Sequence, residues 1–243
     1  GASQRQSKII YDRRDSAFTG YSDEAAGWEE ILAGAGWFHY AGTAVAVAGR
    51  LTPVVARACR AARERGLVVS CDLNYRRKLW TPAQAGETMR ELLPLTDAFV
   101  CGVEEAAAIF GAAIDAGRPG LEQAAGAARQ LGAEFGLKHV VVPLRESHSA
   151  TANRFRALLF SQGQVAVSRL YEIPYIVDRV GAGDALTAGV IFGLSEGWEP
   201  QRTIEFGVAA ACLKHSVPGD FNLVSREEVE ALVAEEGAGR IQR

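Results

Sequence analysis

Apolar runs bounded by turn residues alternate with helix-like stretches along most of this 243-residue chain. The apolar runs are at 37–42, 66–74, 97–102 and 138–144, and the helix-like stretches between them are at 52–66, 81–93 and 120–136. This alternation is typical of a mostly parallel sheet with helices on its faces. The sequence therefore predicts an α/β fold that is built from a series of βαβ units.

The later part of the chain continues with a hairpin and three helices. Strands at 155–163 and 164–171 flank a turn at Gly163, and helices are expected near 182–195, 200–215 and 225–236. At the other end, residues 7–18 look like a strand that runs into a loop. Because no helix or strand precedes it to complete a sheet edge, we expect the chain to start in the middle of a larger fold.

The composition excludes several classes of partner. Charged residues of both signs are interspersed and the formal net charge is −3, which opposes a nucleic acid partner. The four cysteines show no C-x-x-C pair and no neighbouring histidine, which favours reduced thiols over a disulfide framework or a zinc site. No apolar run approaches the roughly 20 residues of a membrane span, and the first residues lack the apolar centre of a signal peptide. We therefore expect a cytoplasmic protein with no membrane partner.

The stretch DRVGAGDALTAG, residues 178–189, combines a glycine turn with the start of an apolar helix. Gly181 and Gly183 permit positive φ angles and carry no Cβ atom, so successive N–H groups can converge on an anion. A helix that opens at this turn adds the positive end of its dipole. The following residues are apolar on nearly all sides, and Gly189 and Gly193 would let a neighbouring element approach closely. The sequence predicts an anion-binding turn before a buried helix.

Asp184 has two interpretations at the first turn of this helix. It can be a helix cap, because aspartate is among the commonest capping residues. A carboxylate beside an anion site can also take a proton from an attacking hydroxyl, while backbone N–H groups hold the charge of a transferred phosphoryl group. Spacing alone leaves both interpretations open.

The same stretch resembles the signature of the ribokinase-like (PfkB) carbohydrate kinases, which reads D-x-x-G-A-G-D and continues into a helix of small residues. The resemblance implies a three-layer α/β/α sandwich with a mostly parallel sheet and a small β lid. It also implies that Asp184 is the general base and that the backbone of Gly181, Ala182 and Gly183 forms the anion hole. The implied cofactors are ATP and Mg²⁺, with the ion neutralising the phosphates.

A second segment, CDLNYRRKLW at residues 71–80, resembles the 2-keto-3-deoxygluconate (KDG) kinases within this family. Period-2 alternation predicts that Asp72, Asn74 and Arg76 lie on one side at the carboxyl end of a strand, where open α/β sheets bind ligands. The resemblance implies that Asn74 and Arg76 face the nucleotide phosphates and the sugar. The plainer alternative is a strand end with a solvated arginine.

The segment YDRRDSA, residues 11–17, is similar to a lid segment of the same KDG kinases. The resemblance implies that Tyr11 and Arg13 bind the sugar acid. The chemistry agrees with this role, because a guanidinium group matches a carboxylate in two parallel hydrogen bonds.

Two later segments extend the resemblance. VVVPLRESHSA, residues 140–150, has the place of a strand and a nucleotide-binding loop, which makes Arg145 and Ser147 candidates for ATP contacts; the family often has glycine where this chain has Arg145. HSVPGDFN, residues 215–222, resembles a late loop whose aspartate, here Asp220, approaches the substrate.

A fifth segment, CGVEEAAAIFG at residues 101–111, matches the N-x-x-E pattern of the family with one departure. Gly102 replaces the asparagine, whereas Glu105 is present. The resemblance therefore implies an indirect, water-mediated role for Glu105 in binding Mg²⁺.

The resemblance covers the whole chain and begins inside the lid region of the family. We expect residues 1–22 to be a lid remnant and residues 23–243 to be the ribokinase-like kinase domain. Family members carry a preceding segment with several strands and a Gly-Gly motif that contacts the sugar. Either the sequence omits this segment or the chain is a degraded copy, and we expect a longer natural chain.

The expected function is an ATP-dependent sugar-acid kinase that phosphorylates 2-keto-3-deoxygluconate (2-dehydro-3-deoxy-D-gluconate) or a close relative. One alternative is a PfkB kinase for another sugar or a nucleoside. Another is a non-catalytic relic of the family that binds a sugar or nucleotide without turnover. The expected partners are a sugar acid and ATP, and pairing of the lid sheets in such kinases implies a homodimer or higher homo-oligomer.

Overall fold

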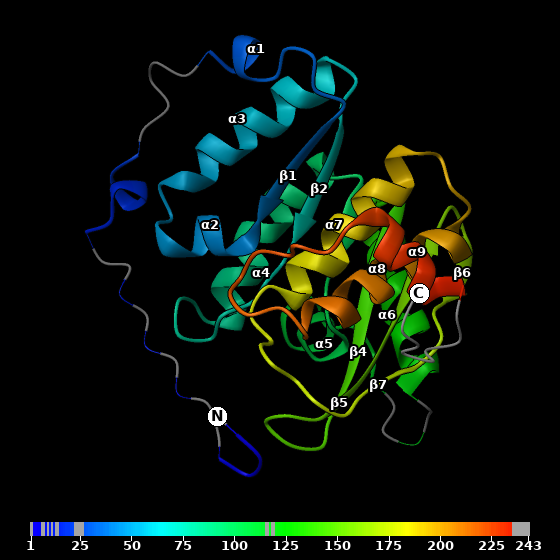
Figure 1. The fold of residues 1–243 in the computed structure, drawn as a ribbon. Coiled ribbons are helices and arrows are strands. Elements are labelled where there is room, and N and C mark those ends of the chain that lie inside the picture. Colours follow the sequence, from blue (N-terminus) through cyan, green and yellow to red (C-terminus); the bar gives the residue numbers. More distant parts are fainter. Residues whose placement is uncertain are drawn as a thin grey trace. The chain divides into compact units, whose positions relative to one another are not determined.

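The computed structural model describes residues 2–5, 8, 10, 12, 15–21, 27–114, 117 and 120–234 (Figure 1). The strands in this part of the chain are β1 (Trp37–Ala41), β2 (Val68–Asp72), β3 (Ala98–Val100), β4 (His139–Ser147), β5 (Asn153–Ser161), β6 (Gln164–Val167) and β7 (Tyr171–Ile173). Their hydrogen-bonded order is β1-β2-β3-β4-β5-β6, and β7 pairs with β5. Neighbours from β1 to β4 are parallel, whereas β5 and β7 are antiparallel.

Helices connect the parallel strands. The helices are η1 (Ala17–Gly20), α1 (Trp28–Ile31), α2 (Gly42–Val47), α3 (Leu51–Glu64), α4 (Pro82–Leu92), η2 (Leu93–Leu95), α5 (Val103–Phe110), α6 (Gly120–Phe135), α7 (Ala182–Ser195), α8 (Pro200–Lys214) and α9 (Arg226–Ala234). Because two parallel strands need a crossover between them, α2 and α3 separate β1 from β2, α4 separates β2 from β3, and α5 and α6 separate β3 from β4. The predicted α/β fold with a mostly parallel sheet is confirmed.

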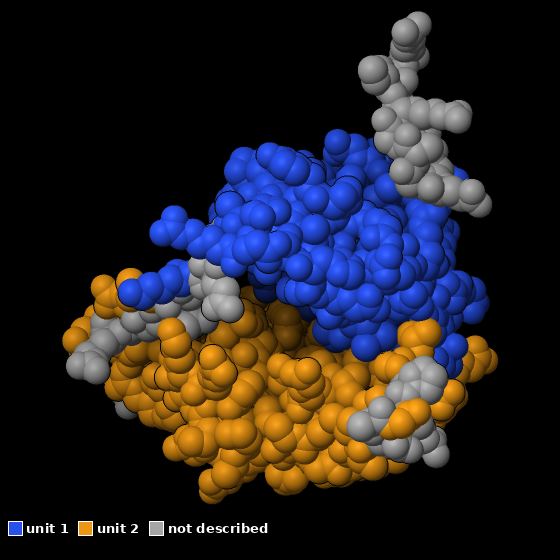
Figure 2. Space-filling model, turned by 90° about the horizontal axis from the view of Figure 1, so that it is seen from below, with its two compact units in different colours: residues 1–9, 143–159, 165–243 blue, residues 10–142, 160–164 orange. Residues whose placement is uncertain are grey.

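The chain divides into two compact units, which are coloured separately in Figure 2. The β1–β4 unit comprises residues 10–142 and 160–164, and the α7–α9 unit comprises residues 1–9, 143–159 and 165–243. Strands β4 and β5 each contribute residues to both units. The boundary expected between residues 22 and 23 stays a prediction.

The core of the β1–β4 unit lies on its central strands. Val69 and Cys71 of β2 and Phe99 of β3 have no exposed surface, and Phe99 packs edge-on against Phe110 of α5. Asp97, just before β3, ties three strand starts together: its carboxylate accepts the N–H of Val69 at 3.0 Å and pairs with Lys138 at 2.9 Å. The register that results places Asp72 opposite both Ala41 and Val100, so that the carboxyl ends of β1, β2 and β3 meet at one edge.

The α7–α9 unit depends on a close approach of α7 and α8. A Cβ atom on Gly189 would lie 2.7 Å from the Cα atom of Gly207, and one on Gly193 would lie 3.0 Å from the side chain of Thr203. The two helices therefore pack nearly backbone to backbone, as predicted from the small residues of α7.

The helices expected from residues 52 and 81 begin within one residue of those positions. Thr81 caps α4 in a capping box with Gln84, with Pro82 at the first helical position. Thr52, in contrast, lies inside α3, because this helix already begins at Leu51.

Several predicted segments differ from the structure. The strand at 66–74 ends at Asp72, and the strand at 138–144 continues to Ser147. Among the described residues of 7–18 there is no strand; Ser16 instead caps the short helix η1. The helices α2 and α5 were not predicted.

Candidate active site

Gly181 sets the geometry of the glycine turn. It is the N-cap of α7 and has a left-handed backbone with φ of 80°. A Cβ atom on this residue would lie 2.1 Å from the carbonyl oxygen of Asp220. Only glycine fits both the backbone angle and the contact. The turn and the late loop predicted to approach the substrate are therefore in direct contact.

Asp178 fastens the turn to the same loop. One carboxylate oxygen accepts the N–H of Val180 and the other accepts the N–H of Gly219, both at 3.0 Å. The hydrogen bond from Val180 is the main cause of a pKa below the ordinary value of the carboxyl, so the group stays ionised at neutral pH. Gly219 has φ of 86°, which turns the chain toward Asp220.

Asp184 is the third residue of α7 and is exposed to solvent. The N-cap of this helix is Gly181, which has no side chain to cap it, and Asp184 is the acidic residue of the first turn, where the helix dipole stabilises its charge. Both interpretations of Asp184 stay open. The residues that follow, Ala185, Leu186 and Thr187, are buried. Asp184 thus presents a carboxylate to solvent beside the first N–H groups of a buried helix, which have no acceptor within the helix.

Arg145 and Ser147 lie in strand β4, and both are exposed. The prediction of a loop at these positions is wrong, because β4 continues beyond the apolar run at 138–144 from which it was predicted. Loss of water around the Arg145 guanidinium is the main cause of its lowered pKa, and the positive charge of Arg179 is the second. Arg179 itself donates to the carbonyl oxygen of Ala150 at 2.6 Å. Two guanidinium groups therefore lie near each other in the α7–α9 unit.

The β1–β4 unit carries Asn74, Arg76 and Glu105. The predicted alternation through Asp72, Asn74 and Arg76 is wrong, because the carboxylate of Asp72 accepts the N–H of Asn74 at 2.9 Å and turns the chain out of the strand. Asn74 has φ of 41°, a conformation that asparagine tolerates better than most residues. Arg76 follows this turn and is exposed.

Glu105 lies in the first turn of α5, and its carboxylate folds back over the start of its own helix. A Cβ atom on Gly102, the N-cap, would lie 2.2 Å from a carboxylate oxygen of Glu105. Gly102 thus makes room for Glu105. Burial raises the pKa of the Cys101 thiol, and the charges of Glu105 and Asp72 raise it further, so both carboxylates lie near this cysteine.

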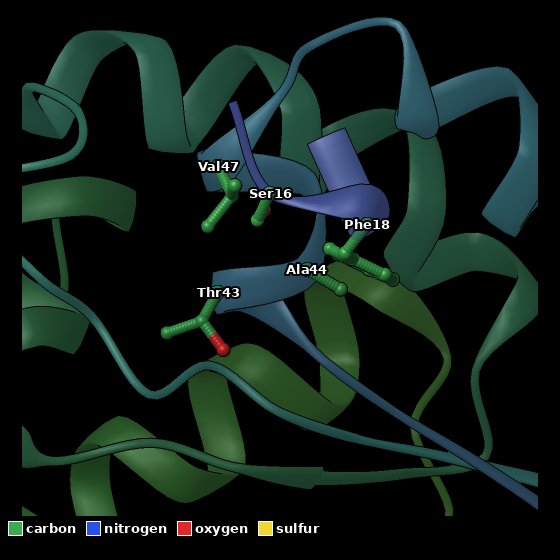
Figure 3. A pocket seen from close by; sticks show the side chains of 5 residues that line it. All are labelled: Ser16, Phe18, Thr43, Ala44 and Val47. Carbon is green, nitrogen blue, oxygen red and sulfur yellow. The ribbon is translucent and has the colours of Figure 1, made fainter. Parts of the chain in front are cut away.

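A pocket of about 350 Å³ lies between η1 and α2 in the β1–β4 unit (Figure 3). Ser16 and Phe18 line it from one side, and Thr43, Ala44 and Val47 line it from the other. The start of α2 also packs on the end of β2, because a Cβ atom on Gly42 would lie 2.3 Å from the carbonyl oxygen of Leu73. Tyr11 and Arg13, the predicted sugar-acid ligands, lie outside the described residues.

Four residues around the glycine turn had no role assigned from the sequence: Asp178, Arg179, Lys214 and His215. His215 accepts the N–H groups of Val177 and Asp178 on its carbonyl oxygen, at 2.9 and 3.2 Å. Asp178 is the first residue of the signature D-x-x-G-A-G-D, so the sequence offered a reason to assign it a role. Nothing in the local sequence shows that the C-terminus of α8 supports the turn.

Within the described part of the chain, no helix is both long and apolar enough to span a bilayer. The same residues hold no cluster of three or more histidine, cysteine, aspartate or glutamate side chains suited to a metal ion.

The chain is similar over most of its length to known carbohydrate kinases. The 2-dehydro-3-deoxygalactonokinase of Haloferax volcanii is 30% identical over 240 residues, which are 98% of this chain and 70% of that protein. The crystal structure of 2-dehydro-3-deoxygluconokinase from Thermotoga maritima is 40% identical with a TM-score of 0.91, over 96% of this chain and 70% of that one. A ribokinase-like fold is shared with a putative Ribokinase II from E. coli in complex with ATP and Mg²⁺, at 22% identity and a TM-score of 0.63, over 85% of this chain and 61% of that one.

The family model for pfkB family carbohydrate kinases matches residues 2–226, which include the turn at Gly181 and Asp184. This chain therefore belongs to the PfkB family of carbohydrate kinases.

Proposed function

We propose that this chain is part of an ATP-dependent kinase that phosphorylates a hydroxyl of 2-keto-3-deoxygluconate or a close sugar acid. The observation that carries the proposal is the geometry of the glycine turn. Gly181 has a left-handed backbone against the carbonyl of Asp220, and an exposed Asp184 follows in the first turn of α7.

The turn suits phosphoryl transfer for two reasons. The first N–H groups of α7 and the positive end of its dipole stabilise the negative charge of the phosphoryl group. The carboxylate of Asp184 takes the proton of the sugar hydroxyl, whose oxygen attacks the γ-phosphorus of ATP. The bond from the γ-phosphorus to the oxygen that bridges to the β-phosphorus breaks, and ADP leaves. Asp184 is then the general base, and Gly181, Ala182 and Gly183 form the anion hole.

We assign ATP binding to the side chains of Asn74, Arg145 and Ser147. We assign sugar-acid binding to those of Arg76 and Asp220. Arg145 supports the assignment because its positive charge, with that of Arg179, suits a polyphosphate.

The sugar-acid preference rests on Tyr11 and Arg13 and on the names of the relatives. Two relatives, which are 30% and 40% identical over nearly the whole of this chain, are named for 2-dehydro-3-deoxy sugar acids. The pocket between η1 and α2 is lined by Ser16, which belongs to the same YDRRDSA segment as Tyr11 and Arg13. A guanidinium fork at Arg13 would fix the carboxylate of such a substrate.

The residues present fit Mg²⁺ held mainly by phosphates and water, because Mg²⁺ usually takes one or two carboxylates rather than a cage of protein ligands. Glu105, with Asp72 near the same cysteine, would hold the ion through water. When bound, Mg²⁺ supplies neutralisation of the phosphate charges. A homodimer and a cytoplasmic location stay predictions.

A substrate panel tests the proposal on the full-length protein. ADP release is measured with ATP and Mg²⁺ for 2-keto-3-deoxygluconate, 2-keto-3-deoxygalactonate, ribose, fructose and adenosine. We expect turnover with the sugar acids at the highest kcat/KM. A higher kcat/KM for a neutral sugar or the nucleoside would identify a different PfkB kinase, and binding without ADP release would identify a non-catalytic relic.

A further inference from the structure

Lys214 is a fully buried charge that the proposed chemistry does not use. It is the last residue of α8 and has no exposed surface. Lysine is almost never fully buried unless its ammonium is paired or hydrogen-bonded. Here the ammonium donates to the carbonyl oxygen of Val217 at 2.9 Å. The position at a helix C-terminus also suits a cation, because the dipole is negative at this end.

The segment that Lys214 holds is the one that contacts the glycine turn. The N–H of Val217 donates back to the carbonyl of Lys214 at 3.0 Å, which closes a tight turn after α8. Two residues later, the N–H of Gly219 donates to Asp178. The carbonyl of His215 accepts two N–H groups of the segment before the glycine turn. The end of α8 and the glycine turn are thus joined at several points.

The positive charge of Lys214 also acts on the carboxylate of Asp178. After the hydrogen bonds from Val180 and Gly219, the ammonium of Lys214 is a further cause of the lowered pKa of Asp178. Asp178 therefore lies in the field of a buried cation while it holds Val180 on one side and Gly219 on the other. Removing the ammonium would leave the Val217 carbonyl without its donor and Asp178 without this charge.

We propose that Lys214 is a positioning residue for phosphoryl transfer, which acts by holding the 215–219 turn and the Asp178 carboxylate together and so fixes Gly181 and Asp184. This inference rests on the proposed function, because it assigns Lys214 a task in that reaction. The ammonium itself does not contact the reacting atoms. Its effect passes through Val217, Gly219 and Asp178.

Kinetics of Lys214→Met, Asp178→Asn and the double variant test the proposal on the full-length enzyme. Each single change should lower kcat by about tenfold to a hundredfold, the scale of a small misplacement of catalytic groups, with the sugar KM within twofold. The double variant should lose little more activity than the more damaging of the two single variants, because both changes break one linkage. Lys138→Met is the matched control: it removes an exposed lysine and should leave kcat unchanged. A kcat within twofold for Lys214→Met, or losses that multiply in the double variant, overturns the proposal.

Amide hydrogen exchange separates this inference from the proposed function. Peptides covering 176–184 and 215–222 should exchange faster in Lys214→Met than in wild type, and Lys138→Met should match wild type. If Lys214→Met does not fold, the same peptides in Asp178→Asn decide, and unchanged exchange there overturns the linkage. A wild-type enzyme that phosphorylates no sugar acid refutes the proposed function, while the exchange result still decides whether the linkage exists.

Discussion

The carbonyl oxygen of Asp220 would lie 2.1 Å from a Cβ atom on residue 181, whereas a Cβ atom on Gly183 would meet no described atom of the chain within 4 Å. The fold therefore requires glycine at 181 but not at 183. A glycine in a helix destabilises it by roughly 0.5–1 kcal/mol relative to alanine. Gly183 has a reason to be there if another molecule, such as a phosphate, approaches its backbone.

Gly183→Ala tests this interpretation. The change should leave the free energy of unfolding unchanged or raise it slightly, because alanine favours the helix and meets no neighbour. It should lower kcat/KM for ATP by at least about tenfold, because a methyl group then displaces the phosphoryl group from the N–H donors. Gly126→Ala in α6 is the matched control, since its Cβ atom also meets nothing, and activity there should not change. Full activity of Gly183→Ala would remove the turn from the anion site.

Gly181→Ala should destabilise the protein itself. Gly197→Ala provides the comparison, because Gly197 also has a positive φ, of 68°, but has open space around it. Alanine at 197 should lower the free energy of unfolding by about 1–2 kcal/mol through the backbone angle alone. Alanine at 181 should lower it further, because the contact with the Asp220 carbonyl adds to the strain, and kcat should fall as well. Chemical denaturation of both variants measures the difference, and equal losses would contradict the contact.

The order of strands and helices could be predicted from the sequence because apolar runs and amphipathic stretches have different lengths and periods. The end of β2 could not be predicted in this way, because a hydrogen bond from the backbone to a side chain determines it. Asp72 captures the N–H of Asn74 and ends β2 two residues early, although the apolar run and the alternation continue. The helix α5 was missed because its N-cap is Gly102, which supplies no side-chain cap before Val103.

The glycine turn and the helix start could be predicted because one short segment contains both. The glycine turn, Asp184 and the start of α7 lie within a few residues, so the pattern alone located them. Lys214 and Asp178 are 36 residues apart in the numbering, and their linkage passes through backbone groups of Val217 and Gly219. Backbone partners leave no trace in residue types, so this support appears only in the fold.

Asp97 predicts an acid dependence of stability. Burial raises the pKa of its carboxyl, but the Val69 N–H and then Lys138 more than offset this, so the pKa is lower than in the unfolded chain. A lowered folded pKa stabilises the protein above the unfolded value, near pH 4, and this stabilisation disappears as the pH falls through the folded value. Wild type and Asp97→Asn should differ most in unfolding free energy at neutral pH and converge as the pH falls through the lowered folded pKa of this carboxyl. The exposed Glu64→Gln serves as control, and a difference that is independent of pH would contradict the role of the charge.

Asp184→Asn tests the general base. Asparagine keeps the size of the side chain but cannot take a proton, so kcat should fall by about 10² to 10⁴ in the full-length enzyme. The affinity for ATP, measured by titration calorimetry, should stay nearly the same, because the N–H groups of the turn remain. Turnover within twofold of wild type would contradict the role of Asp184 as base.

Arg13 tests the choice of substrate, because YDRRDSA places it beside a kinase site in the resemblance to the KDG kinases. If its guanidinium holds the sugar carboxylate by two parallel hydrogen bonds, Arg13→Lys keeps the charge but loses the planar pair and should still impair use of the acid. Arg13→Ala should reduce transition-state stabilisation by about 2–5 kcal/mol in kcat/KM, since the carboxylate is left buried and unpaired. Activity on a neutral analogue without the carboxylate should change far less. Steady-state kinetics of wild type and both variants on the two substrates measure these losses. Equal losses on the acid and the neutral analogue would mean that Arg13 only supports the lid. This result would favour a kinase for a neutral sugar.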